Sequence, residues 1–119
     1  MQIQVHTDHN LHGGESLHER VEALLRDAVG RFAEQITRVE AHLGDENAHK
    51  GGGNDMRCML EARLAGQPPV AVTEHAPTLE QAINGAIGKL KRALDTHAGK
   101  QESARQRAPG LSDLSAPEA

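Results

Sequence analysis

Two segments in the middle of the chain alternate polar and apolar residues so regularly that they fix the kind of layer the protein must contain. The inward positions of residues 36–44 and 57–64 are apolar: Val39, Ala41, Leu43, Cys58, Leu60, Ala62 and Leu64. The outward positions are mostly charged or polar: Arg38, Glu40, His42, Arg57, Met59, Glu61 and Arg63. Successive side chains of a strand point to opposite faces of a sheet. The sequence therefore predicts a sheet with one apolar and one polar face.

Turn chemistry and further alternation complete this sheet. Residues 46–55, with Gly51, Gly52 and Gly53 followed by Asn54 and Asp55, predict a long hairpin loop between the two strands. Residues 2–6 alternate in the same way and predict a first strand. Residues 66–68 predict a turn into a fourth strand around Val70 and Val72.

A first helix is predicted from about residue 16 to residue 34. Ser16 and Glu19 have the spacing of a capping box, in which each side chain bonds a free backbone amide. Gly30 falls inside the predicted helix. The residues with helical spacing form one apolar stripe, which we expect to be buried: Leu17, Val21, Leu24, Ala28 and Phe32.

A second helix begins with another capping box, formed by Thr78 and Gln81 directly after Pro77. Its apolar stripe consists of Leu79, Ile83, Ile87, Leu90 and Leu94. We expect the helix to end near Gly99. Residues 101–119 are rich in Ser, Ala, Pro and Gln without apolar periodicity, which predicts a disordered tail after a domain of residues 1–100.

The predicted order β-α-β-β-β-α favours an α+β fold, a two-layer sandwich of a four-stranded sheet with both helices on one face. The chain has one Phe and neither Trp nor Tyr among 119 residues, so its core must be aliphatic. The same lack of aromatic residues argues against RNA-binding modules that stack bases on aromatic rings.

Several features predict a soluble cytoplasmic protein. The single cysteine, Cys58, has no intramolecular partner for a disulfide. Neither a signal peptide nor an apolar run of membrane-spanning length is visible, so we expect no membrane partner.

The net charge of −4 argues against general binding of polyanions, but the charge is unevenly distributed. Within residues 86–107, only Asp95 and Glu102 oppose a larger set of basic residues: Lys89, Lys91, Arg92, Lys100, Arg105 and Arg107. The local field of such a segment matters more for docking than the total charge does. The second helix is therefore the first place to look for a binding surface.

The sequence resembles the family of hibernation promoting factors and ribosome-associated inhibitors, the sigma-54 modulation family, over residues 1 to about 100. Residues 1–5 are similar to its first strand, and the second helix carries its pattern of an Ala-Ile pair, a Lys-Leu pair and a later Arg: Ala82, Ile83, Lys89, Leu90 and Arg92. The β-α-β-β-β-α order is also shared with double-stranded-RNA-binding folds.

The resemblance implies a function without catalysis. Family members dock in the channel of the small ribosomal subunit that messenger and transfer RNA would occupy, and they suppress translation. The basic residues that the resemblance places at the rRNA are Arg20, Arg31, Lys89, Lys91, Arg92 and Lys100. The chain would be a short form, monomeric when free, with no small-molecule substrate.

Other functions have weaker support in the sequence. A family-like fold that has lost ribosome binding and serves as a protein-interaction module is the main alternative. His6, His9 and His12 suggest a metal, but no helical His pair accompanies them, so we expect no metal site and no cofactor. Cys58 is predicted to face the core, so we expect no catalytic residue and no enzyme.

Gly85 and Gly88 are expected on the exposed side of the second helix. We interpret them as tolerated substitutions rather than as positions that let a phosphate backbone approach closely.

Overall fold

The computed structural model describes residues 1–8, 11, 14–46 and 56–107, and its elements follow the predicted order β-α-β-β-β-α. The strands and helices are β1 (Gln2–Thr7), α1 (Gly14–Val29), the short 3₁₀ helix η1 (Gly30–Phe32), β2 (Ile36–Asp45), β3 (Met56–Leu64), β4 (Val70–Ala76) and α2 (Leu79–Arg107).

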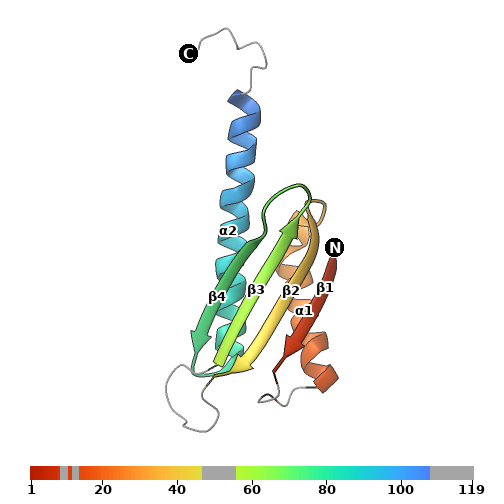
Figure 1. The fold of residues 1–119 in the computed structure, drawn as a ribbon, viewed down its shortest axis with the longest axis vertical. Coiled ribbons are helices and arrows are strands. Elements are labelled where there is room, and N and C mark those ends of the chain that lie inside the picture. Colours follow the sequence, from red (N-terminus) through yellow and green to blue (C-terminus); the bar gives the residue numbers. More distant parts are fainter. Residues whose placement is uncertain (9–10, 12–13, 47–55, 108–119) are drawn as a thin grey trace.

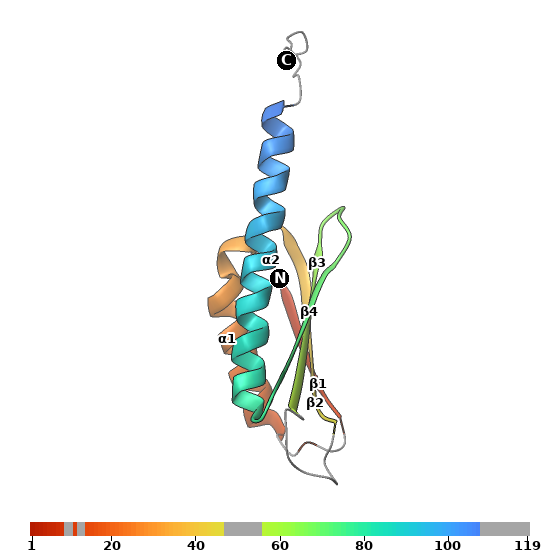
Figure 2. The same cartoon turned by 90° about the vertical axis from the view of Figure 1, so that its left-hand side faces the viewer.

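The four strands form one mixed sheet in the order β1-β2-β3-β4 (Figure 1). The pair β1–β2 is parallel, because α1 carries the chain back to the other end of the sheet before β2 begins. The pairs β2–β3 and β3–β4 are antiparallel. Both helices cover the same face of this sheet (Figure 2), which confirms the predicted fold class.

The core lies between the sheet and the two helices. The predicted inward rows of β2 and β3 are confirmed, and Val39, Ala41 and Leu60 are fully buried. Every buried side chain among the described residues is apolar, and Phe32 is the only aromatic one. None of the described helices is long and apolar enough to cross a membrane.

The structure corrects both the bounds and the buried face of the first helix. Helix α1 begins at Gly14, which has a positive φ of 65°, so Ser16 lies inside the first turn and the predicted capping box is wrong. The helix ends at Val29, so Gly30 begins η1 instead of lying inside α1.

The buried stripe of α1 is rotated relative to the prediction. Leu25 and Val29 are fully buried, whereas Leu24 is 38% exposed and Ala28 is half-buried. The sequence offers two stripes here because Leu24 and Leu25, like Ala28 and Val29, are adjacent. The packed stripe continues from Val21 at intervals of four residues.

Helix α2 begins as predicted and ends later. The backbone N–H of Gln81 donates to Oγ1 of Thr78 at 3.1 Å, which confirms the cap. The predicted end near Gly99 is wrong, since α2 continues to Arg107 and extends beyond the sheet (Figures 1 and 2). Residues 100–107 contain good helix formers, and the next strong helix breaker in the sequence is Pro109.

Two predictions fall on parts of the chain outside the description. Residues 47–55 of the predicted hairpin loop and residues 108–119 of the predicted tail lie outside the described residues. The division into a domain of residues 1–100 and a disordered tail stays a prediction.

Candidate functional site

Three of the six predicted basic residues are exposed and make no ion pair with another described residue. Arg20 lies on α1, and Lys91 and Arg92 lie next to each other on α2. Lys91 precedes Asp95 by one helical turn and therefore lies on the same side of α2, whereas Arg92 points about 100° away from Lys91. These three side chains are the ones available to an anionic partner.

The charge of Arg31 is matched by a partner within the protein. Its guanidinium forms an ion pair with Asp95 of α2, and its central carbon lies 4.5 Å from the centre of the Phe32 ring. Both partners of the ion pair are more than half exposed, so the pair contributes at most about 1 kcal/mol. Its main effect here is to match the charge of Arg31 and to link η1 to α2.

The charge of Lys89, on the other side of α2, is also matched within the protein. Its Nζ lies 2.7 Å from Oε1 of Glu74 and donates a hydrogen bond to the backbone oxygen of Thr73 at 2.8 Å. Both partners belong to the edge strand β4. Lys89 therefore fastens α2 to the sheet, and its charge is matched by a carboxylate.

The two glycines of α2 have structural neighbours. A Cβ at Gly85 would lie 2.7 Å from Cγ of Glu74, so this glycine makes room for the side chain that pairs with Lys89. The expectation that Gly85 lies on the exposed side of the helix is wrong, because it is half-buried against β4. Gly88 lies under the guanidinium of Arg92, with Nη1 of Arg92 at 3.5 Å from an added Cβ.

The six predicted basic residues thus differ in whether their charge is matched. Lys89 pairs with Glu74 of β4 and Arg31 pairs with Asp95 of α2, so neither adds an unmatched charge to Arg20, Lys91 and Arg92. Lys100 belongs to the part of α2 whose side chains lie outside the description. The assignment of these six residues to RNA binding stays a prediction.

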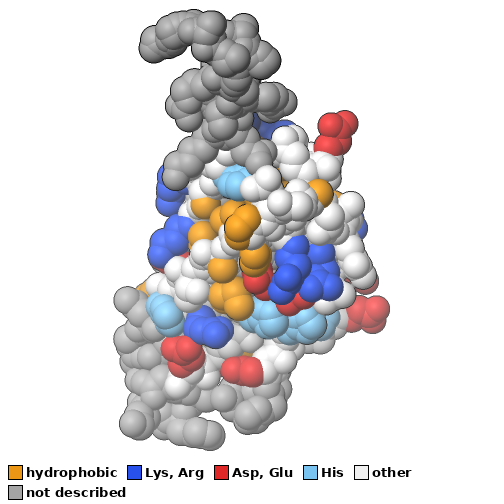
Figure 3. All heavy atoms as spheres, turned by 45° about the horizontal axis from the view of Figure 1, so that its top comes forward, with side chains coloured by type: hydrophobic (Ala, Val, Ile, Leu, Met, Phe, Trp, Pro, Cys, Tyr) orange, Lys and Arg blue, Asp and Glu red, His pale blue; other side chains and the backbone are white. Residues whose placement is uncertain are grey.

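The open face of the sheet is polar, as predicted, and its charges are balanced. Arg38 faces Arg63 across β2 and β3, and Glu40 faces Glu61 in the same way. Along each strand the charges are opposite, with 2.9 Å between Arg38 and Glu40 and 3.7 Å between Arg63 and Glu61. Figure 3 shows basic, acidic and histidine side chains next to one another on one side of the molecule.

A cluster of ligand-bearing side chains joins β1 and β2 on this face. His6 lies directly across from His42, and their rings are stacked with 4.7 Å between the ring centres. His42 donates from Nε2 to Oε1 of Glu40 at 3.2 Å. This hydrogen bond lowers the pKa of Glu40 below its ordinary value, and the charge of Arg38 acts in the same direction.

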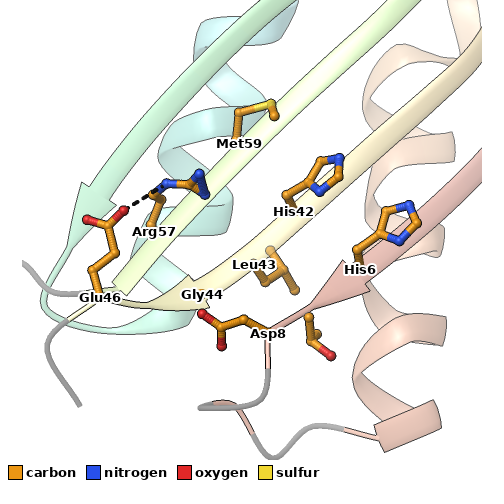
Figure 4. Close-up of a pocket in the computed structure, with 9 residues that line it drawn as sticks. His6, Asp8, His42, Leu43, Gly44, Glu46, Arg57 and Met59 are labelled. Atoms are coloured by element: carbon orange, nitrogen blue, oxygen red, sulfur yellow. Dashed lines mark ion pairs between the residues drawn. The ribbon is translucent and has the colours of Figure 1, made fainter. Parts of the chain in front are cut away.

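A surface hollow of about 380 Å³ adjoins the two histidines (Figure 4). On one side Glu46 pairs with Arg57 at 2.9 Å and with His75 at 3.1 Å. On the other side the chain passes close to itself, because a Cβ at Gly44 would lie 2.7 Å from Oδ2 of Asp8. The lining residues are His6, Thr7, Asp8, His42, Leu43, Gly44, Glu46, Arg57 and Met59.

Sequence reasoning missed this cluster because it grouped His6 with its neighbours along the chain. His9 and His12 lie outside the described residues, whereas His42 reaches His6 through the parallel pairing of β1 and β2. The outward position of His42 was predictable from alternation. Its register against β1 was not, because a helix separates the two strands.

Cys58 has the character of a core residue. It is fully buried, and burial raises the pKa of its thiol to about 12. The thiolate is therefore scarce at neutral pH, and Cys58 is not an activated nucleophile.

The chain has relatives in sequence and in fold. The sequence model of the family described as sigma 54 modulation protein / S30EA ribosomal protein matches residues 3–102. The N-terminal domain of Protein Y from Thermus thermophilus is 21% identical, with a TM-score of 0.65 over 82% of this chain and 99% of that one. A ribosomal subunit interface protein from Coxiella burnetii is 14% identical, with a TM-score of 0.59 over 83% of this chain and 99% of that one. No curated protein sequence matches the chain.

Proposed function

Because the chain belongs to the family of the sigma 54 modulation protein / S30EA ribosomal protein, we propose that it is a ribosome-associated factor that suppresses translation. In this proposal it binds the rRNA of the small subunit and occupies the decoding channel. The observation that carries the proposal is the family match, which runs from the second residue of β1 through α1 and the other three strands to residue 102 in α2. The names of the two structural relatives, one of them a ribosomal subunit interface protein, support it.

The free cations of the helical layer supply the contacts for such a partner. Arg20, Lys91 and Arg92 are exposed and not neutralised by a described neighbour, in contrast to Arg31 and Lys89. Cations of this kind bind phosphates and release the counterions of the RNA, which makes affinity depend on salt. The net charge of −4 means that binding must come from this local surface.

The long helix α2 extends the same surface. Its 29 residues span about 43 Å at 1.5 Å per residue, and the part beyond the sheet carries three more basic positions in its sequence. These positions are Lys100, Arg105 and Arg107. A helix of this length reaches along an RNA channel further than the two-layer body alone.

Suppression by this means requires neither catalysis nor a cofactor. Phosphate contacts position the domain without reading the base sequence, and its volume excludes the RNAs that would occupy the same channel. A cytoplasmic location, as expected from the sequence, accompanies this role. The outcome is a steric block that is reversed when the protein dissociates.

Cosedimentation with purified small ribosomal subunits at low and moderate salt tests this proposal. The variant Lys91→Glu/Arg92→Glu should bind much more weakly than the unaltered protein, and its salt slope should be smaller by about 1 to 2. The matched control is Arg57→Glu/Arg63→Glu, which changes the net charge equally on the open face of the sheet. Absence of binding at low salt, or equal losses in both variants, would contradict the proposal.

A protein-interaction module is the second candidate, and one observation favours it. Glu74 and Asp95 match the charges of Lys89 and Arg31, two cations that the family resemblance assigns to RNA. The exposed surface of α1 also carries Glu15, Glu19 and Asp27. A protein partner with basic side chains would suit that acidic surface, and it would be retained by the Lys91→Glu/Arg92→Glu variant.

A further inference from the structure

We infer that His6, Glu40 and His42 form a binding site for a divalent transition-metal ion, with Zn²⁺ as the representative ion, on the open face of the sheet. One ligand atom from each of the three side chains lies within 4.8 Å of the others. This inference is independent of ribosome binding, which we assign to the opposite, helical layer.

The backbone holds the three ligands on one face. His6 and His42 are register partners in the parallel pair β1–β2, so their side chains leave the sheet next to each other (Figure 4). Glu40 precedes His42 by two residues on β2 and therefore points to the same face. Strand pairing, rather than a mobile loop, determines the positions of all three Cα atoms.

The distances are close to those that zinc requires. In a tetrahedral site with bonds of about 2.0–2.1 Å, neighbouring ligand atoms are about 3.4 Å apart. Nε2 of His42 and Oε1 of Glu40 are 3.2 Å apart, with a proton between them. An ion can replace that proton. The exposed ring of His6, now stacked on that of His42, must turn so that one of its nitrogens faces the ion.

The surroundings keep the carboxylate of Glu40 oriented. Arg38 binds the second oxygen of Glu40, Oε2, at 2.9 Å, which leaves Oε1 directed toward His42. Such an outer partner orients a ligand in many metal sites. The positive charge of Arg38 opposes a bound cation, and Glu61, which faces Glu40 across β2 and β3, already pairs with Arg63 at 3.7 Å.

Two imidazoles and one carboxylate leave a fourth coordination position open. His6 and His42 both line the surface hollow of about 380 Å³, so a bound ion has space beside it for water or for a group from a partner. Imidazole and carboxylate ligands suit zinc and its neighbours in the transition series, and they do not suit ions that require thiolates. The chain's own residues therefore define an open three-ligand site.

Calorimetric titration of the tag-free, full-length protein with Zn²⁺ tests this inference. We expect one ion per chain, with affinity reduced at least about tenfold in His42→Ala and in Glu40→Gln. The matched control is His75→Ala, which removes an exposed histidine of the same face that pairs with Glu46 instead. Co²⁺ provides a second probe, because its visible absorption reports tetrahedral coordination and should be lost in His42→Ala.

Circular dichroism verifies that each variant retains its fold, and His42→Gln provides a milder substitution if alanine disturbs β2. Two results would overturn the assignment. One is the absence of stoichiometric binding to the unaltered chain. The other is binding that survives His6→Ala and His42→Ala but is lost when His9 and His12 are replaced together.

Discussion

Gly85 and Gly88 lie one turn apart in α2. We expect replacement by alanine to change the stability of the protein differently at the two positions. Both are half-buried, and alanine gains about 1 kcal/mol of intrinsic helix stability over glycine in a helix interior. At Gly88 the nearest atom to a new Cβ is Nη1 of Arg92 at 3.5 Å, an ordinary contact. Gly88→Ala should therefore realise most of that gain.

At Gly85 the same substitution meets the side chain of Glu74. The new Cβ would lie 2.7 Å from Cγ and 2.9 Å from Cδ of Glu74, which is closer than non-bonded carbon atoms approach. Glu74 must move, and its ion pair with Lys89 is lost at a cost of about 0.2–1 kcal/mol, since the pair is partly exposed. The net gain at Gly85 is therefore smaller than at Gly88, and we expect Gly88→Ala to be the more stable of the two variants by about 0.2–1 kcal/mol.

Urea denaturation followed by circular dichroism measures this difference. The control is the Glu74→Ala background, in which the obstruction is absent and Gly85→Ala should stabilise about as much as Gly88→Ala does. Equal stabilisation by both substitutions in the unaltered background would refute the assigned packing of Glu74 between β4 and α2.

Three further predictions follow from burial and charge. Leu25→Ala should cost about 2–5 kcal/mol in denaturant unfolding, whereas Leu24→Ala should cost well under half as much because Leu24 is 38% exposed; similar costs would contradict the observed face of α1. Cys58 should be unreactive toward a thiol reagent in the native protein and reactive in urea, and fast native labelling would contradict its burial. The pKa of Glu40 is lowered in the folded state, so its stabilisation is present above the ordinary glutamate pKa of about 4.3 and lost as pH falls through the folded value. Glu40→Gln should therefore lose less stability on acidification than the unaltered protein, and an unchanged acid limb in denaturation curves would count against that assignment.

Local pattern was sufficient to predict the sheet but insufficient for α1. The inward rows of β2 and β3 followed from the alternation of side chains along a strand. Once one face is apolar, this alternation determines which residues are buried. In α1 the adjacent pair Leu24 and Leu25 allows two apolar stripes, and only packing against the sheet selects Leu25. The N-terminal cap of α2 was predictable because its acceptor, Oγ1 of Thr78, and its donor, the backbone N–H of Gln81, lie only three residues apart in the chain.

The candidate sites depended on contacts that no local pattern contains. Lys89 was predicted to be exposed and unpaired. In the structure it pairs with Glu74, which lies on β4 in the sheet layer, whereas Lys89 lies on α2 in the helical layer. Arg31 is neutralised by Asp95, which lies 64 residues away in the chain. The meeting of His6 with His42 likewise depends on strand register. Which charged side chains remain available to a partner therefore depends on contacts between residues distant in the chain more than on composition.

The central claim is that the chain occupies the decoding channel of the small ribosomal subunit. A cryo-electron microscopy map of the small subunit with saturating protein tests it most directly. We expect density for the two-layer domain between the head and the body, with Lys91 and Arg92 of α2 against rRNA phosphates. Density at another position on the subunit, or a map without the protein under low-salt conditions, would contradict it.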